Sequence, residues 1–330
     1  MQDKSANNAI IYLIILNWNG YVDTCACLDS LRGIAPANLR VVVVDNASTN
    51  DSLSHISDWA AAKGIETLQI DRVTAESAAP TRDLQDRIVL IQTGKNLGFA
   101  GGNNVGIRYA LKMGAECVWL LNNDTVVKPD SVKPLIAALY SEDSIGIVGS
   151  CILYYDRPNI VQTAGMKLGP HNLQISHLGQ GKAATDISVS RQTEVACVPA
   201  CSILVRRELM QDIGLMDESY FMYHEDVDWQ IRAKRAGWKI VYVPGSKVLH
   251  KCGGSTKRSQ FVGAYYQSRN KFILISKNEG RLAFLFMVPL GFAFIRNILV
   301  AFLSGDHKAA WGIWQGGKDF FFGRSGHREF

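Results

Sequence analysis

The sequence predicts an α/β fold, in which a mostly parallel sheet flanked by helices is followed by a helical C-terminal appendage that associates with membranes. Three observations support this prediction. Short apolar runs alternate with helix-like segments through residues 10–121. The runs are continuously apolar, as in the valines at 41–44, which is typical of parallel strands buried on both faces. After residue 255, the alternation gives way to long apolar stretches flanked by basic residues.

The elements are expected in strand–helix order because each apolar run is followed by a turn and then by a segment of helical spacing. The polar segment 69–87 is expected to be a surface insertion without secondary structure. Gly237 is expected to end a helix that starts beside the carboxylates of FMYHEDVDW. The expected strands are 10–16, 40–44, 87–92, 117–121 and 239–243 with an extension, and the expected helices are 21–32, 52–63, 104–113 and 227–236.

Composition limits the class of protein. With 47% apolar residues, the 330-residue chain can form an ordered core, in one large domain with an appendage or in two domains. Residues 1–250 carry a net charge of −3 and residues 251–330 one of +8, which predicts an anionic surface as partner of the C-terminal part. The basic residues surround apolar helix rather than forming a groove-sized face, so nucleic acid is not an expected partner.

The cysteines and the first apolar run indicate a reduced, intracellular protein. The seven cysteines are scattered, odd in number and without a CxxC pair, so they are expected to be buried thiols. The run 9–16 is too short to span a membrane and no small-residue cleavage site follows it. It is therefore expected to be a buried strand rather than a signal peptide.

Four polar or glycine-rich segments directly follow expected strands: 17–20, 45–48, 94–104 and 122–124. Ligands of parallel α/β sheets bind beyond the carboxyl ends of the strands, so a binding site is expected where these segments meet. Asp45 suits a hydrogen bond to a base or ribose, although an N-cap or Asx turn explains it as well. The glycines of 94–104 permit close approach to an anion, but the segment matches neither a Walker A loop nor GxGxxG.

Three further features carry chemistry. Asp124, which follows two asparagines, can ligate a hard cation, or the segment is only a turn before Pro129. Asp226 lies among aromatic and acidic neighbours that raise the pKa of a carboxyl group toward that of a general base; the alternative is a helix start with acidic residues at the positive end of its dipole. His250 ends a strand-like run and is either a metal ligand or a structural residue.

Taken together, these motifs resemble family 2 glycosyltransferases of the GT-A fold, in particular their rhamnosyltransferase-like branch. The resemblance covers residues 10–255, and the motifs occur in the family's order. The matching segments are IILNWNG (14–20), VVVVDNAST (41–49), NLGFAGGNNVGI (96–107), WLLNNDTVV (119–127), IGLMDESYFMYHEDVDWQIRAKRAGWKIVYVP (213–244) and the later His250.

The resemblance implies a role for each site residue. Asp226, with Glu225 beside it, would be the catalytic base, and Trp229 and Arg232 would shape the acceptor side. Asp124 and His250 would hold a Mg²⁺ or Mn²⁺ ion, although Asn122 stands where the family's DxD motif has its first carboxylate. Asp45 would recognise the nucleotide base. The residues implied around the nucleotide sugar are Asn17, Asn19, Asp45, Ala47, Ser48, Asn96, Gly98, Phe99, Asn103 and Asn123.

The implied activity is inverting transfer of a sugar from a nucleotide diphosphate sugar to a hydroxyl of a glycan or polyprenyl-linked saccharide, in cell-surface polysaccharide synthesis. The resemblance favours dTDP-L-rhamnose as donor, with UDP-galactofuranose, UDP-glucose and UDP-N-acetylhexosamine as alternatives. A nucleotide-sugar-binding protein without turnover is the rival class, against which the intact Asp226 argues. The absence of GxGxxG after the first strand argues against a Rossmann oxidoreductase.

Three regions are expected: a nucleotide-sugar half over 1–127, an acceptor half over 128–255 and the C-terminal region over 256–330. The stretch 282–303 is long enough to span a membrane, but Pro289 and Arg296 favour an interfacial helix or a helical hairpin. This predicts a location on the cytoplasmic face of the plasma membrane, peripheral or anchored by the C-terminal region. A buried helix or a homodimer interface is the alternative. The residues expected to meet the membrane are Lys271, Lys277, Arg281, Lys308, Trp311, Trp314 and 320–322.

Overall fold

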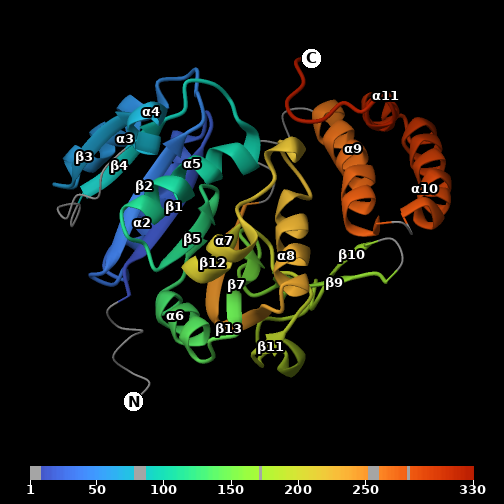
Figure 1. Cartoon of the computed structure of the whole chain (residues 1–330). Coiled ribbons are helices and arrows are strands. Elements are labelled where there is room, and N and C mark those ends of the chain that lie inside the picture. Colours follow the sequence, from blue (N-terminus) through green and yellow to red (C-terminus); the bar gives the residue numbers. More distant parts are fainter. Residues whose placement is uncertain (1–8, 78–86, 171–172, 252–259, 281–282) are drawn as a thin grey trace.

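One large sheet forms the centre of the protein (Figure 1). The computed structural model describes residues 9–77, 87–170, 173–251, 260–280 and 283–330. The strands of the sheet are β1 (Ile11–Asn17), β2 (Leu39–Asp45), β3 (Glu66–Asp71), β4 (Arg87–Gln92), β5 (Cys117–Asn122), β6 (Thr125–Val127), β7 (Ile145–Tyr154), β8 (Val161–Thr163), β11 (Thr193–Glu194), β12 (Ser202–Arg206) and β13 (Lys239–His250). Their order is β11-β13-β7-β12-β5-β1-β2-β4-β3, with β6 paired to β13 and β8 to β7.

The sheet is mostly parallel, as the sequence predicts. β3, β4, β2, β1 and β5 run parallel, β12 is antiparallel to its neighbours β5 and β7, and β7 and β13 are parallel to each other. A separate hairpin, β9 (Met166–Leu168) with β10 (Ile175–His177), stands off the sheet. From β1 the chain proceeds to β2 on one side and later returns to β5 on the other. The carboxyl ends of β1 and β5 therefore flank a topological switch point, where such sheets form a crevice.

Helices cover both faces of the sheet because its central strands are apolar on both sides. Ile14 and Val44 pack under one group of helices, and Leu13 and Val43 pack under the other. The first group holds α4 (Arg72–Ser77), α5 (Gly98–Lys112), α7 (Arg207–Ile213) and α8 (Glu225–Arg235), and the second holds α2 (Tyr21–Leu31), α3 (Ser52–Ala62) and α6 (Val132–Tyr140). Two short 3₁₀ helices, η1 (Ile187–Val189) and η2 (Glu218–Tyr220), complete this part. The cysteines of the described residues are free thiols and, as expected, are buried, except that Cys25 is only partly buried.

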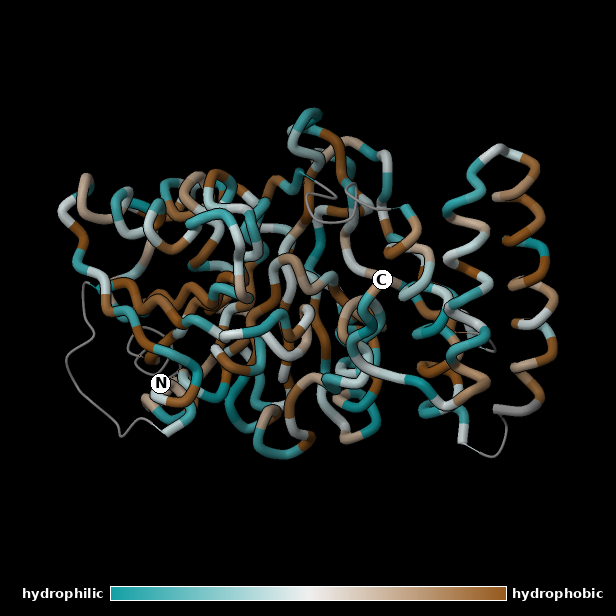
Figure 2. The backbone as a smooth tube through the Cα atoms, turned by 90° about the horizontal axis from the view of Figure 1, so that it is seen from above, coloured by the Kyte–Doolittle hydropathy of each residue, from teal (hydrophilic) through white to brown (hydrophobic). Residues whose placement is uncertain are grey.

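Three helices form the C-terminal part: α9 (Gln260–Asn278), α10 (Ala283–Leu303) and α11 (His307–Phe321). Gly312 and Gly316 of α11 leave no room for a Cβ against the α9 backbone, so the two helices pack closely. α10 is the outermost helix and is largely apolar (Figure 2). Its residues Leu285–Leu303 are long and apolar enough to cross a membrane, and none of them is buried, so the buried-helix alternative is wrong.

The structure corrects three expectations about the elements. Segment 69–87 is not wholly irregular, because it contains the end of β3 and α4; residues 78–86 lie outside the described part. α5 starts at Gly98 rather than at residue 104. α10 is one continuous helix through Pro289, not a hairpin in itself. The expected boundary at 255/256 falls within 252–259, which are also outside the described part.

Candidate active site

A cavity of about 630 Å³ opens at the carboxyl ends of β1 and β5, at the switch point of the sheet. Trp18 and Asn19 after β1 line one side, and Asn123 and Asp124 after β5 line the adjacent side. The start of α8, with Glu225 and Asp226, also lines the cavity. The further lining comes from the β9–β10 hairpin, from α9 and from the segment before β12, through Met166, Ile175, His177, Pro199, Ala200, Cys201 and Gln267.

Asp124 and His250, which are 126 positions apart in the sequence, meet at this cavity. The antiparallel pairing of β13 with β6 places His250 opposite Thr125, beside the turn that carries Asp124. The His250 Nε2 lies 3.3 Å from Asp124 Oδ1. The register between β13 and β6 therefore brings the two expected metal ligands together.

A side chain that the sequence analysis missed, Gln162, orients the imidazole. Its Oε1 lies 3.1 Å from His250 Nδ1. An amide oxygen only accepts hydrogen bonds, so Nδ1 carries a proton, and in the neutral imidazole the lone pair is then on Nε2, which faces the Asp124 carboxylate. Two electron-rich atoms at this separation suit a cation that both contact, and the donor set fits Mg²⁺ or Mn²⁺. No cluster of three His, Cys, Asp or Glu side chains occurs in the described residues, so such an ion would take further ligands from substrate and water.

Glu225 and Asp226 form a pair of carboxyl groups at the first turn of α8. Asp226 remains partly accessible from the cavity, and its Oδ1 accepts a hydrogen bond of 2.9 Å from the Val227 amide. Glu225 is buried, and its Oε2 has no hydrogen-bond partner among the described residues.

Glu225 and Asp226 differ in the surroundings that set the pKa of each carboxyl group. Burial raises the pKa of Glu225 well above its ordinary value, and the neighbouring Asp226 charge raises it further. Burial also raises the pKa of Asp226, but backbone hydrogen bonds from Val227 and Ala200 oppose that rise. We expect the pair to carry one proton, on Glu225. Asp226 is then the anion that can accept a proton from a substrate.

The backbone leading into α8 is strained. Phe221, Tyr223 and His224 have φ of 66°, 67° and 72°, a conformation that favours glycine. Asn270 of α9 holds this segment, because its Nδ2 donates to the carbonyls of Tyr220, Met222 and Tyr223 at 2.8, 2.6 and 3.0 Å. The C-terminal helices therefore fix the loop that presents Asp226.

Replacing Asn270 by Ala is expected to release this loop. The lost hydrogen bonds leave buried carbonyls unpaired, which should lower the free energy of unfolding by roughly 1–3 kcal/mol. Displacement of Asp226, the expected base, should also reduce turnover by about 10²-fold. Thermal unfolding and kcat measured for Asn270→Ala, beside the exposed control Asn159→Ala, test this. A variant with wild-type kcat would contradict the role of Asn270.

Asp45, the residue expected to recognise the nucleotide base, forms with neighbouring residues a scaffold beneath the loops rather than a cavity lining. Asp45 is 1% exposed and accepts hydrogen bonds from Asn17 Nδ2, Gln92 Nε2 and Ser48 N at 2.7, 2.9 and 3.0 Å. Ser48 Oγ also accepts from the Asn19 amide at 2.8 Å. Asp45, Asn17 and Ser48, with the adjacent Ala47, do not line the cavity, whereas Asn19 and Asn123 do.

The glycine-rich segment also has a different role from the one expected. The Phe99 amide at the start of α5 donates to the Phe221 carbonyl at 2.6 Å, so this helix end does not face an anion. Gly98, at φ 72°, leaves no room for a Cβ against Phe221. Asn96 accepts from the Gly98 amide, and Asn103 donates to the Phe99 carbonyl, both at 2.9 Å. Only Phe99 of the four expected residues lines the cavity.

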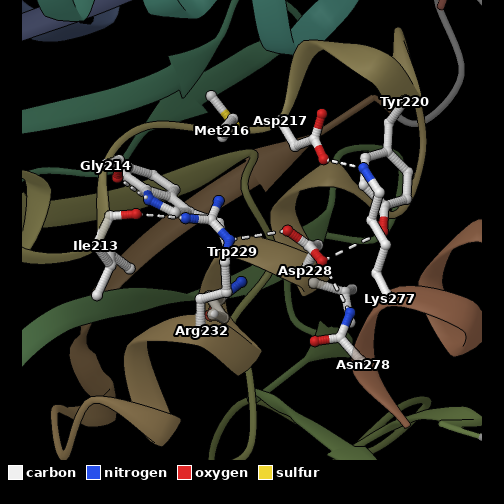
Figure 3. A network of polar contacts seen from close by, with 12 residues as sticks. Ile213, Gly214, Met216, Asp217, Tyr220, Asp228, Trp229, Arg232, Lys277 and Asn278 are labelled. Carbon is white, nitrogen blue, oxygen red and sulfur yellow. Dashed lines mark hydrogen bonds and ion pairs between the residues drawn. The ribbon is translucent and has the colours of Figure 1, made fainter. Parts of the chain in front are cut away.

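Trp229 and Arg232 are not on the acceptor side, and the structure corrects this expectation (Figure 3). Trp229 is fully buried and donates from Nε1 to the Gly214 carbonyl at 2.8 Å. Arg232 donates to the carbonyls of Ile213 and Leu215 and pairs with Asp228 at 3.0 Å. Asp228 in turn accepts from Asn278 Nδ2 at 2.8 Å. These residues join α8 to α9 and to the segment after α7.

The comparisons with known proteins agree with this architecture. The family profile described as "Glycosyltransferase like family 2" matches residues 8–271. The dTDP-rhamnosyl transferase RfbF of Shigella flexneri is 24% identical over 280 residues, which are 82% of this chain and 82% of that protein. The N-acetylglucosaminyl-diphospho-decaprenol L-rhamnosyltransferase of Mycobacterium tuberculosis is 29% identical over 202 residues, 56% of this chain and 66% of the relative.

A solved structure has the same fold. A mannosyltransferase of Pyrobaculum calidifontis in complex with GDP-Man and Mn²⁺ superposes with a TM-score of 0.54 at 13% identity, covering 95% of this chain and 87% of the other. The fold is therefore GT-A, as expected from the motifs.

Proposed function

The chain belongs to glycosyltransferase family 2, and on that premise we propose that it is an inverting, metal-dependent enzyme that transfers a sugar from a nucleotide diphosphate sugar to an acceptor hydroxyl. One observation carries the proposal. The partly accessible carboxylate of Asp226 and the Asp124–His250 pair face one cavity at the carboxyl edge of the sheet. A base for the acceptor and ligands for the diphosphate are thus available on two sides of the same space.

Asp226 would act on the acceptor. Its carboxylate takes the proton from the acceptor hydroxyl as that oxygen attacks the anomeric carbon. Glu225 keeps its own proton in its buried position and does not compete as a base. A single displacement with one base inverts the anomeric centre and needs no nucleophilic carboxylate.

Asp124 and His250 would hold Mg²⁺ or Mn²⁺, and Gln162 would keep the His250 Nε2 lone pair available to it. The ion, when bound, neutralises the charge of the leaving nucleoside diphosphate. Asn122, in place of a second carboxylate, leaves the ligation to this pair. Asn19 and Asn123 line the donor side, while Asp45, through Asn17 and Ser48, supports the loop that carries Asn19.

The donor and the acceptor are proposed from the relatives. Two of them are named as rhamnosyltransferases, and one name specifies a decaprenol diphosphate saccharide. We therefore propose dTDP-L-rhamnose as donor, and a glycan or polyprenyl-linked saccharide of cell-surface polysaccharide synthesis as acceptor. Residues up to 127 would serve the donor and 128–255 the acceptor.

The outer surface of α10 supports attachment to a membrane. Leu285, Val288, Phe292, Ile295 and Leu299, all more than half exposed, form a stripe with alternating spacings of three and four residues. Such a stripe also suits a second copy of the chain, but exposed Trp311 and Trp314 on α11 favour a membrane interface. α10 packs against α9 through the Phe294 and Phe272 rings, 5.6 Å apart, so we propose that it lies along the membrane surface.

The proposed function is tested with a panel of nucleotide sugars. Donor binding and donor hydrolysis are measured with Mn²⁺ and with Mg²⁺, for dTDP-L-rhamnose, UDP-galactofuranose, UDP-glucose and UDP-N-acetylhexosamine. We expect one donor to bind and turn over, with dTDP-L-rhamnose preferred. If no nucleotide sugar binds with either metal, the assignment of the cavity fails. Binding without turnover favours the nucleotide-sugar-binding alternative.

A further inference from the structure

A second cavity of about 250 Å³ lies between α9, α10 and α11. His224 and Gln267 line this cavity and also line the first one. The two cavities therefore adjoin at these side chains, and the second lies between the outer helices and the site that holds Asp226.

The walls of the second cavity are of two kinds. Phe272 and Ile313, with Leu290 and Phe294 from α10, provide apolar surface. Lys271 and Asn297 provide hydrogen-bond donors, whereas the Ser268 hydroxyl donates to the Ile313 carbonyl, and no carboxyl group lines the cavity among the described residues. This combination suits an amphiphilic anion rather than a neutral apolar ligand or a free sugar.

Among the described residues that line this cavity, Lys271 is the one with a cationic side chain at neutral pH. Its Nζ donates to the Leu173 carbonyl at 2.5 Å, which leaves two of its three protons for a ligand. Lys277, six residues on, instead forms an ion pair with Asp217. Burial lowers the pKa of Lys271 to about 8, so the side chain is still mostly charged near neutral pH. The sequence places Lys271 at a lipid surface, whereas the structure turns it inward.

We propose that this second cavity binds the diphosphate and the first isoprene units of a polyprenyl diphosphate-linked acceptor, with Lys271 contacting the diphosphate. The proposal rests on the proposed function and names the acceptor class for it. The isoprene chain would leave between α9 and α10 toward the membrane-facing stripe of α10. The saccharide would extend past His224 and Gln267 into the first cavity, where Asp226 lies.

The test uses farnesyl diphosphate as probe, in the presence of a chelator so that no metal recruits the diphosphate to the first cavity. Binding to the full-length protein is measured calorimetrically, beside farnesol, inorganic diphosphate and phosphatidylglycerol vesicles. We expect farnesyl diphosphate to bind at least tenfold more tightly than farnesol or inorganic diphosphate. Lys271→Gln should weaken farnesyl diphosphate binding roughly 10- to 150-fold and leave farnesol unchanged, because one charge-assisted hydrogen-bonding group is lost.

Three further variants keep the test decisive. Lys271→Arg should retain most of the affinity for farnesyl diphosphate. Ala293→Trp should weaken the binding of both farnesyl diphosphate and farnesol, because the larger side chain fills the space along the apolar wall. Lys308→Gln, on the exposed start of α11, should change the binding of neither ligand. The proposal would be overturned if neither Lys271→Gln nor Ala293→Trp changed the affinity for farnesyl diphosphate. It would also be overturned if Lys271→Gln weakened vesicle binding but not farnesyl diphosphate binding. Nucleotide-sugar binding is measured on the same samples. Its absence in the wild type would refute the proposed function while leaving the lipid diphosphate site standing.

Discussion

Asp226→Asn is expected to reduce glycosyl transfer by roughly 10³-fold or more while leaving donor binding within about twofold of wild type. The amide keeps the volume and the Val227 hydrogen bond at Oδ1 but cannot accept the acceptor proton. Single-turnover transfer and calorimetric donor binding separate the two effects. A variant that still turns over at near wild-type rate would show that another group is the base.

Glu225→Gln is the matched control for this pair. Because Glu225 is expected to carry a proton, the neutral amide replaces a neutral acid, and turnover should fall by no more than about tenfold. The pH profile adds a second readout. Burial raises the pKa of Asp226 above its ordinary value, and the base works only when deprotonated, so activity should be present above that raised pKa and be lost as pH falls through it. Equal damage from both substitutions would contradict the separation of roles.

Metal removal is expected to have the second largest effect. A chelator should lower transfer by wild-type protein on the order of 10³-fold, because several kcal/mol of charge stabilisation on the leaving diphosphate are lost. Added Mn²⁺ or Mg²⁺ should restore the wild type but not Asp124→Ala, and His250→Gln should need a much higher metal concentration. These effects are measured as transfer rate against free metal concentration.

Asp23→Asn is the control for the metal experiment. Asp23 lines the same cavity, but its carboxylate is paired with Lys251 at 2.6 Å. Its loss should leave the metal concentration dependence unchanged. Wild-type activity that is insensitive to the chelator, or an Asp23→Asn profile equal to that of Asp124→Ala, would contradict the assignment of the metal pair.

The strands could be predicted from the sequence because β1, β2, β4 and β5 are buried on both faces, and burial makes each of them a continuous apolar run. The start of α5 could not be predicted from the sequence. Its glycines look like a loop, yet Gly102 and Gly106 lie inside the helix, where a Cβ would collide with Leu16 and Ile14 of β1. Here close packing of helix on sheet, rather than phosphate binding, requires glycine.

The site was predictable only in part. The motifs identified Asp124, His250 and Asp226, which the fold brings to one cavity. Gln162 and Asn270 carry no local signal, because their roles arise from strand register and from the packing of α9 on a distant loop. Trp229 and Arg232 share α8 with Asp226, but Trp229 is buried and the partly exposed Arg232 is directed at the carbonyls of Ile213 and Leu215 rather than at the cavity.

The central claim is that this cavity binds a metal-bridged nucleoside diphosphate beside Asp226. It is tested most directly by anomalous diffraction at the manganese edge from crystals grown with Mn²⁺ and dTDP. We expect one manganese peak in contact with both Asp124 and His250, with the diphosphate next to it in the 630 Å³ cavity. Diphosphate bound outside that cavity, or manganese bound where neither side chain reaches it, would contradict the account.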